Sequence, residues 1–360
     1  MSLSSDVAMV RAPGQRRAPR LRPAHSLVVT PAVVAHRGAS GYRPEHTLEA
    51  YRTAIRMGVD DIELDLVCTA DGVLLARHDV ELSLTTDVAD HREYADRHRT
   101  LTIDGVEQRG WFVTDFTHAE VKRLTARERR PAARPHSAAH DGRYGVPTLN
   151  EVLAMVEAES VRRGRMVGVM LELKHASWFD SIGLGLAEPL LRDLARHGVD
   201  HARSRVSVMS FEPTILRTLA GCAKVPLIQL LDAGSVPADF VAANDPRTYA
   251  DLVTPAGLAW IERYADGLGV HVDLVLARTP GGMLGEPTSL VRDAHAEWLT
   301  VHTWTLRAEN ATLPVDLRIG ADPHTHGDLP GLARRLLDAG VDGLITDHPD
   351  LVFPALSERT

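Results

Sequence analysis

The sequence is poor in cysteine, in excess positive charge and in long apolar runs, and each shortage excludes a class of protein. Only Cys68 and Cys222 occur in 360 residues, which excludes a disulfide scaffold and leaves open whether these two pair. No apolar run approaches the roughly 18 residues of a membrane-spanning helix, so we expect no stable membrane insertion. The formal net charge of −8 argues against a nucleic-acid partner, since binding to phosphates needs a basic face.

The remaining composition is that of a globular enzyme. Hydrophobic residues make up 44% of the chain and charged residues 24%, both ordinary for a soluble protein. A chain of 360 residues can bury a full core, and α/β barrels often use this length as one unit. Length and composition leave the substrate and the oligomeric state open.

The first 31 residues predict a basic, disordered tail. Such a segment before the apolar run 27–29 imitates a secretory leader, but Pro31 interrupts that run, and cleavage after it would remove the strand that carries His36. We therefore expect no intact leader. The compartment stays open, cytoplasmic for the chain as it stands and extracytoplasmic if a leader was trimmed. The tail has no helical or strand period, and five arginines stand against the single acid Asp6: Arg11, Arg16, Arg17, Arg20 and Arg22.

The stretch 33–51, VVAHRGASGYRPEHTLEAY, predicts a buried strand, a glycine turn and a helix. The strand ends in His36 and Arg37. A titratable imidazole and a permanent cation at the end of a buried strand are typical of α/β enzymes, which present their catalytic groups there. A histidine that only satisfies a strand end would fit this motif alone equally well, so the rest of the chain has to decide.

The segment 60–67 predicts a strand with two carboxylates on one face. Glu63 and Asp65 are two positions apart, which places them about 6.5–7 Å from one another on the same side. Inside a sheet such a pair would cost several kcal/mol unless positive charge lies between its members. A divalent cation with oxygen ligands meets that need. The alternative is a solvent-facing edge strand.

A tight turn and a short returning strand, 73–79, bring His78 back towards Asp65. Residues 80–146 differ from the preceding segments in composition and pattern. They are rich in charge, and only the stretch from 116 to 121 predicts a short capped helix. A span of this length without regular pattern indicates a functional insertion on a scaffold. We expect residues 32–356 to form a single domain that carries this insertion after the second strand.

Eight apolar strands, mostly separated by helical patterns, predict a parallel sheet covered by helices. Eight such units indicate a closed (β/α)8 TIM barrel, in which chemistry gathers where the strands end. Polar residues do fall at these ends: His36, Arg37, Glu63, Asp65, Glu172, Lys174, Trp304 and Asp347. The predicted strands are 33–36, 60–67, 166–173, 206–210, 225–231, 271–276, 299–304 and 343–347.

The charged residues at the strand ends suit a site for a metal ion and a phosphate group. Glu63, Asp65 and Glu172 would give three hard oxygen ligands, appropriate to Ca²⁺ or Mg²⁺ and unsuited to zinc. Arg37 and Lys174 would bind an anion, and phosphate fits best. In-line displacement at phosphorus also needs a base and an acid on opposite sides of the phosphate. The two histidines, His36 and His78, could supply them.

Five motifs together closely resemble the glycerophosphodiester phosphodiesterases. They are VVAHRGASGYRPEHTLEAY, DDIELDLVCTADGVLLARHD, LELK, HTWT and DGLITDHPD, and the resemblance runs from about residue 33 to 354. It implies a barrel enzyme that uses a divalent cation to cleave glycerophosphodiesters into an alcohol and sn-glycerol 3-phosphate. It also implies roles by motif: catalysis for His36 and His78, metal binding for Glu63, Asp65 and Glu172, phosphate binding for Arg37 and Lys174, and contact with the glycerol for Trp304.

Some positions are ambiguous or depart from the family pattern. Glu45 matches the glutamate after the glycine turn and could be a further polar ligand or a residue at the helix N-terminus. His46 stands where an asparagine is usual, and His348 where an aromatic residue is usual; both bear on substrate fit more than on chemistry. The long insertion resembles the calcium-using periplasmic branch, whose members are normally exported, and this conflicts with the missing leader.

Two other functions remain as alternatives. A related barrel phospholipase D-type enzyme would act on intact lipids, but it needs an apolar membrane-facing loop. Within the charged insertion only Trp111 and Phe112 would serve. An inactive surface-binding homologue would have lost part of the histidine and carboxylate set, and the whole set is present.

Overall fold

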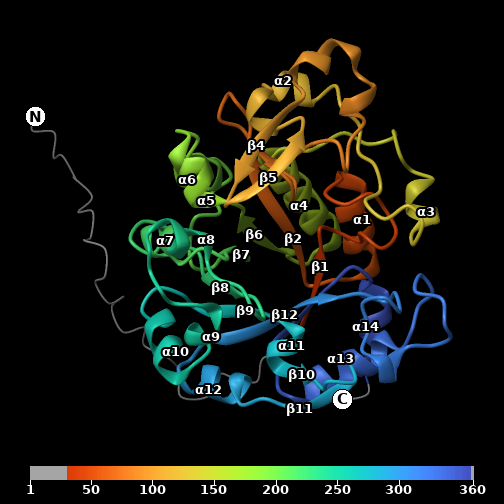
Figure 1. Cartoon of the computed structure of the whole chain (residues 1–360), viewed down its shortest axis with the longest axis vertical. Coiled ribbons are helices and arrows are strands. Elements are labelled where there is room, and N and C mark those ends of the chain that lie inside the picture. Colours follow the sequence, from red (N-terminus) through yellow and green to blue (C-terminus); the bar gives the residue numbers. More distant parts are fainter. Residues whose placement is uncertain (1–30, 358–360) are drawn as a thin grey trace, which may run out of the picture.

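The computed structural model describes residues 31–357, so the predicted tail 1–31 lies outside the described residues except for Pro31. Eight parallel strands form a closed barrel, in which each strand pairs with the next and the last pairs with the first (Figure 1). The predicted TIM barrel is therefore confirmed. In order around the barrel the strands are β1 (Ala32–His36), β2 (Asp61–Cys68), β6 (Gly168–Leu173), β7 (Val206–Ser210), β8 (Leu227–Leu231), β9 (Gly267–His271), β12 (Thr300–Leu306) and β13 (Gly343–Thr346).

Helices surround the barrel, and side-chain caps fix where several of them begin. Thr47 caps α1, and Thr148 with Glu151 forms the capping box predicted for α4. The longer helices are α1 (Leu48–Met57), α4 (Leu149–Arg163), α6 (Ala187–Arg196), α13 (Leu329–Asp338) and α14 (Pro349–Ser357). The shorter ones include α5 (Ala176–Ser181), α7 (Pro213–Leu219), α8 (Ala238–Ala242), α9 (Tyr249–Leu252), α10 (Pro255–Ile261) and α12 (Leu290–Ala296).

The prediction of a barrel strand at 271–276 is wrong. The barrel strand is β9, Gly-Leu-Gly-Val-His, and the residues after it form the short helix α11 (Val272–Val275). The glycines hide the strand because they contribute no apolar side chain to its pattern. They are required by close packing: a Cβ on Gly267 would lie 2.3 Å from Thr300 Oγ1, and one on Gly269 would lie 2.4 Å from Leu230 Cδ2.

The insertion contains more regular structure than the sequence predicts. After β3 (Leu74–Ala76), which pairs antiparallel with β2, comes a hairpin of β4 (Arg99–Ile103) and β5 (Val106–Gly110). The predicted capped helix is present as α2 (His118–Val121), and α3 (Pro135–Ala138) follows. The hairpin was missed although Asp104 and Gly105, with φ of 48° and 79°, form the Asp-Gly turn typical of two-residue loops.

The insertion packs on the barrel through buried apolar side chains. In Figure 1 the hairpin and α2 lie together at the top. Leu82, Phe112, Phe116 and Val121 are fully buried and belong to the same hydrophobic core as the barrel residues. From this shared core we infer that 32–356 folds as one domain and 80–146 is its insertion.

Two further expectations concern the cysteines and membrane spans. Cys68 is buried, Cys222 is exposed, and neither is in a disulfide. Among residues 31–357 there is no helix with the length and apolar character to cross a bilayer.

Candidate active site

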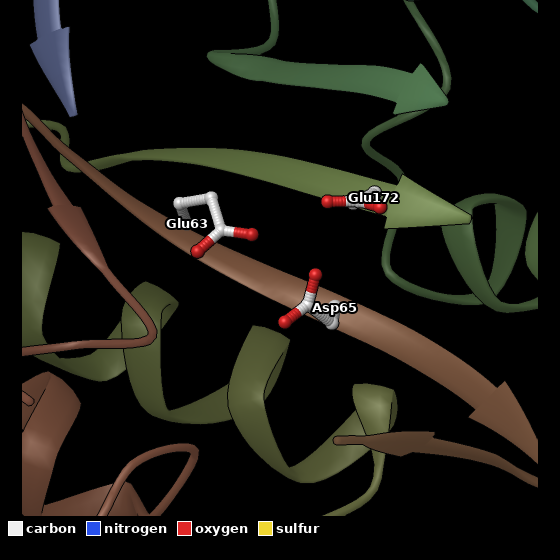
Figure 2. Close-up of side chains that lie close together, drawn as sticks. All are labelled: Glu63, Asp65 and Glu172. Atoms are coloured by element: carbon white, nitrogen blue, oxygen red, sulfur yellow. The ribbon is translucent and has the colours of Figure 1, made fainter. Parts of the chain in front are cut away.

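Three buried carboxylates meet where β2 and β6 run side by side. Glu63 and Asp65 project from β2 and Glu172 projects from β6, where Asp65 and Glu172 are partners in the strand register (Figure 2). Each residue offers one oxygen, and these oxygens all lie within 4.8 Å of one another. The predicted alternative of a solvent-facing edge strand is excluded, since β2 lies between β1 and β6 and both of its carboxylates are 1% exposed.

The electrostatics of these acids favour a bound cation. Burial, together with the neighbouring Asp65 carboxylate, raises the pKa of Glu63 well above its usual range. Burial raises the pKa of Glu172 to about 8. Lys174 acts to lower this pKa, and repulsion from Asp65 offsets part of that effect. Burial also acts on Asp65, but Arg37, Lys174 and His78 outweigh it and hold its pKa well below the usual range.

The donor set fits a hard divalent cation. Oε1 of Glu172 is buried, and the cation beside it is the Lys174 ammonium, whose Nζ forms an ion pair with it at 2.8 Å. A carboxylate oxygen of this kind, facing two further carboxylates, suits Ca²⁺ or Mg²⁺ better than zinc. The three side chains could therefore hold such an ion.

Two cations lie against the carboxylates. Arg37 has a left-handed backbone, with φ of 58°, which lets its own N–H donate to Glu63 Oε2 at 2.8 Å. Its Nε lies 3.1 Å from Asp65 Oδ2. The ammonium of Lys174, besides its pairing with Glu172, lies 3.2 Å from His78 Nε2. Arg37 and Lys174 thus bring positive charge to the same side as the carboxylates.

The two predicted histidines both face this site, and each is held by a carboxylate through Nδ1. His36 Nδ1 lies 2.6 Å from Asp347 Oδ1, and His78 Nδ1 lies 2.7 Å from Asp79 Oδ1. Burial, with the charge of Arg37, lowers the pKa of His36 to about 4 and that of His78 to about 3, against the opposing effect of carboxylates. Both imidazoles are therefore neutral near pH 7, and Nε2 of His78 is within hydrogen-bonding distance of the Lys174 ammonium.

A cleft joins these groups and has one apolar wall. Trp304 forms part of that wall; its Nε1 donates to Gly269 O at 2.9 Å, and its ring packs edge-on against Phe211 with centroids 5.3 Å apart. A small ligand would therefore meet charge on one side and aromatic surface on the other. The cleft is lined by His36, Arg37, Glu63, His78, Glu172, Lys174, Met209, Phe211, Leu230, Trp304, Thr305, Arg307 and Ile345.

Glu45 lies just before helix α1 and contacts a cation of the site. Helix α1 begins after Thr47, so Glu45 is outside its first turn, and it does not line the cleft. Its carboxylate instead lies between two guanidinium groups, 3.1 Å from Arg37 Nη1 and 2.8 Å from Arg129 Nε. Glu45 thus links Arg37 to the insertion.

Several residues of the site were not predicted from the sequence. His46 donates or accepts at both ring nitrogens, 2.9 Å from Asp65 Oδ2 and 2.7 Å from the Tyr51 hydroxyl, so the histidine at this position supports a carboxylate of the cluster. Three arginines and one acid were also missed: Arg129, Arg134, Arg307 and Asp79. The arginines carry no sequence signal, since each stands in a charged loop or at a strand end where arginine is ordinary.

Comparison with known proteins agrees with this architecture. The profile of the Glycerophosphoryl diester phosphodiesterase family matches residues 36–351. The chain is 33% identical to glycerophosphodiester phosphodiesterase GDPD6 of Arabidopsis thaliana, over 88% of this chain and 83% of the relative. It is 30% identical to the glycerophosphodiester phosphodiesterase of Bacillus subtilis, over 88% and 84%.

Solved structures share the fold. A putative glycerophosphoryl diester phosphodiesterase from Silicibacter pomeroyi superimposes with a TM-score of 0.65 at 22% identity, covering 96% of both chains. An Oleispira antarctica phosphodiesterase, solved with the product sn-glycerol-3-phosphate, gives 0.60 at 20% identity, covering 91% of this chain and 97% of that one. With the barrel and the family profile both spanning nearly all of the described residues, this chain belongs to the glycerophosphoryl diester phosphodiesterase family.

Proposed function

We propose that this enzyme hydrolyses small glycerophosphodiesters to an alcohol and sn-glycerol 3-phosphate, with a divalent cation, Ca²⁺ or Mg²⁺, and with histidine acid–base catalysis. One observation carries the proposal: oxygens of three carboxylates lie within 4.8 Å of one another, and two of these residues, Glu63 and Glu172, line a cleft together with two cations and two imidazoles. The Oleispira antarctica phosphodiesterase, which has the same fold, was solved in complex with this product. A cation held by Glu63, Asp65 and Glu172 would stabilise negative charge on the phosphate oxygens.

The other groups of the cleft would bind the substrate and transfer protons. Arg37 and Lys174 bind the phosphate anion, and Trp304 contacts the glycerol. Of His36 and His78, one accepts the proton of the attacking oxygen and the other protonates the leaving alcohol. An anionic diester in the cleft raises the pKa of both imidazoles, because it adds negative charge beside groups that burial and Arg37 keep neutral.

Intact lipids are a poor substrate for this surface. Of the two aromatic residues in the insertion that would meet a membrane, Phe112 is fully buried and Trp111 donates its Nε1 proton to Tyr94 O at 2.7 Å. Within residues 80–146 the exposed large apolar side chains are Leu84 and Val106, which lie 22 positions apart in the sequence and form no loop of apolar character.

A paired substrate assay tests the proposal. The purified chain is given glycerophosphocholine or its diacyl parent, with added Ca²⁺ or Mg²⁺, and the release of choline from each is measured; sn-glycerol 3-phosphate is identified as the second product of glycerophosphocholine. We expect kcat/KM for the deacylated substrate to be larger by about a hundredfold or more, a difference of about 2.7 kcal/mol. A panel of head groups then defines the preferred alcohol. Release of phosphocholine in place of choline, or faster turnover of the diacyl lipid, would overturn the proposal.

A further inference from the structure

Both active-site histidines are connected to one short segment of the insertion. This arginine segment, residues 128–134, lies outside the barrel strands, yet it reaches the carboxylates that contact the two histidines. Arg134 bonds the carboxylate that holds His36, and Arg129 bonds the carboxylate that holds His78. Between them the backbone makes a single turn, in which Arg134 N donates to Arg130 O at 2.9 Å.

The connection to His36 is buried. Arg134 Nη2 donates to Asp347 Oδ2 at 2.6 Å, while the other oxygen of Asp347 meets His36 Nδ1. Nε of Arg134 donates to Glu309 at 2.6 Å and Nη1 donates to Ser40 O at 2.9 Å. These three contacts fix the guanidinium in one orientation. Burial opposes ionisation of Asp347, but Arg307 and Arg134 together hold its pKa well below the usual range, so this carboxylate stays ionised against the imidazole.

The connection to His78 is more open and runs on to the phosphate side. Arg129 Nη2 donates to Asp79 Oδ2, while Asp79 Oδ1 meets His78 Nδ1. Arg129 also forms a two-point contact with Glu45, with Nε and Nη2 each 2.8 Å from a carboxylate oxygen. Because Glu45 in turn contacts Arg37, a continuous chain of charge-assisted bonds links the proposed phosphate-binding arginine to His78.

We propose that Arg129 and Arg134 are positioning residues, which orient His78 and His36 through Asp79 and Asp347. A carboxylate that accepts from Nδ1 fixes the tautomer with its lone pair on Nε2, the nitrogen that can then exchange a proton. A guanidinium behind the carboxylate fixes the plane of that carboxylate, and with it the angle of the imidazole. The insertion thus completes the catalytic geometry of both histidines, and a barrel without it would hold them loosely.

Double-mutant cycles test this inference, which rests on the proposed function. We expect Arg129→Met to lower kcat on glycerophosphocholine by about ten- to a hundredfold. In an Asp79→Asn background the same change should lower kcat little further, because the path to His78 is already broken, and the remaining effect through Glu45 and Arg37 should fall on KM. In an Asp347→Asn background, in contrast, Arg129→Met should lower kcat by the same factor as in the wild type, since Asp347 contacts His36 and Asp79 contacts His78.

The connection from Arg134 through Asp347 to His36 is tested with a conservative substitution, since loss of the buried Arg134 charge would leave Glu309 and Asp347 without their partner. Arg134→Lys should lower kcat by about tenfold, with no further loss in Asp347→Asn. Arg127, whose side chain pairs with Asp90 on the surface, supplies the matched control: Arg127→Met should leave kcat unchanged. Circular dichroism and thermal melting of every variant check the fold.

The outcomes separate the two proposals. An inactive wild-type enzyme refutes the proposed function. If the wild type is active and Arg129→Met has the same kcat, the positioning role is refuted. It is also refuted if Arg129→Met lowers kcat by the same factor in the Asp79→Asn and the Asp347→Asn backgrounds, because this would indicate general loosening of the insertion. If Arg134→Lys does not fold, the cycles on Arg129 decide.

Discussion

Changing His36 or His78 to alanine is expected to lower kcat by about 10²–10⁴-fold, the usual contribution of a general acid or base. Each imidazole has Nδ1 bonded to a carboxylate and lines the cleft, so its removal takes away a proton-transfer group without opening the core. Steady-state hydrolysis of glycerophosphocholine measures the loss. The double variant should be little worse than the poorer single one, because the two groups act on one transition state.

Folding of these variants is expected to be intact. Asp347 keeps its contacts with Arg134 and Arg307 when His36 is removed, and Asp79 keeps Arg129 when His78 is removed. His302→Ala is the matched control, since His302 lies on the first half of β12, beside Asp61 at the start of β2, and lines a different pocket. Near-normal kcat in both His36→Ala and His78→Ala would remove the acid–base assignment and leave only the metal and phosphate contacts.

Much of the site could be predicted because it depends on short-range patterns. Period-two alternation in β2 places Glu63 and Asp65 on one face, and the fold then determines which strand lies beside them. Once eight strands are recognised, β6 follows β2 around the barrel, and Glu172 comes next to Asp65. Capping boxes such as that of Thr148 are equally local. Local patterns and the recognition of a barrel are therefore enough to predict this part of the site.

The residues that were missed depend on long-range contacts. Arg134 and Asp347 are 213 positions apart, and Arg129 and Asp79 are 50 apart. In the sequence, the run around Arg129 resembles a solvated loop, since only the folded insertion buries it against the barrel. The error at β9 has another cause, because glycines chosen for close strand packing remove the apolar signal that identifies a strand.

Removal of the metal ion should abolish activity, and substitutions of Glu63 and of Asp65 should affect the stability of the metal-free protein in opposite directions. With a chelator we expect kcat to fall by about a thousandfold or more, equal to about 4 kcal/mol of lost charge stabilisation, and to recover with Ca²⁺ or Mg²⁺. Added cation at about 100 times its Kd should also stabilise the fold by about 2.7 kcal/mol, a rise of roughly 5 °C in Tm.

Glu63→Gln separates the cation from the rest of the cluster. The amide oxygen of Gln can still accept from the Arg37 N–H that Glu63 accepts now, and the change removes a buried carboxylate whose pKa is raised by burial and by Asp65. Without added metal, this variant should therefore be as stable as the wild type or more so. It should nevertheless lose most of the Tm rise produced by cation, and most of the activity.

Asp65→Asn should behave in the opposite way in the metal-free protein. Asp65 lies within 3.1 Å of Arg37 Nε and 2.9 Å of His46 Nε2, so its neutralisation leaves Arg37 without part of its compensation and lowers Tm. The contrast between two carboxylates on one face of β2 follows from their partners, because Glu63 mainly meets like charge and Asp65 meets cations. An equal Tm rise with cation in wild type, Glu63→Gln and Asp65→Asn would show that the ion binds elsewhere.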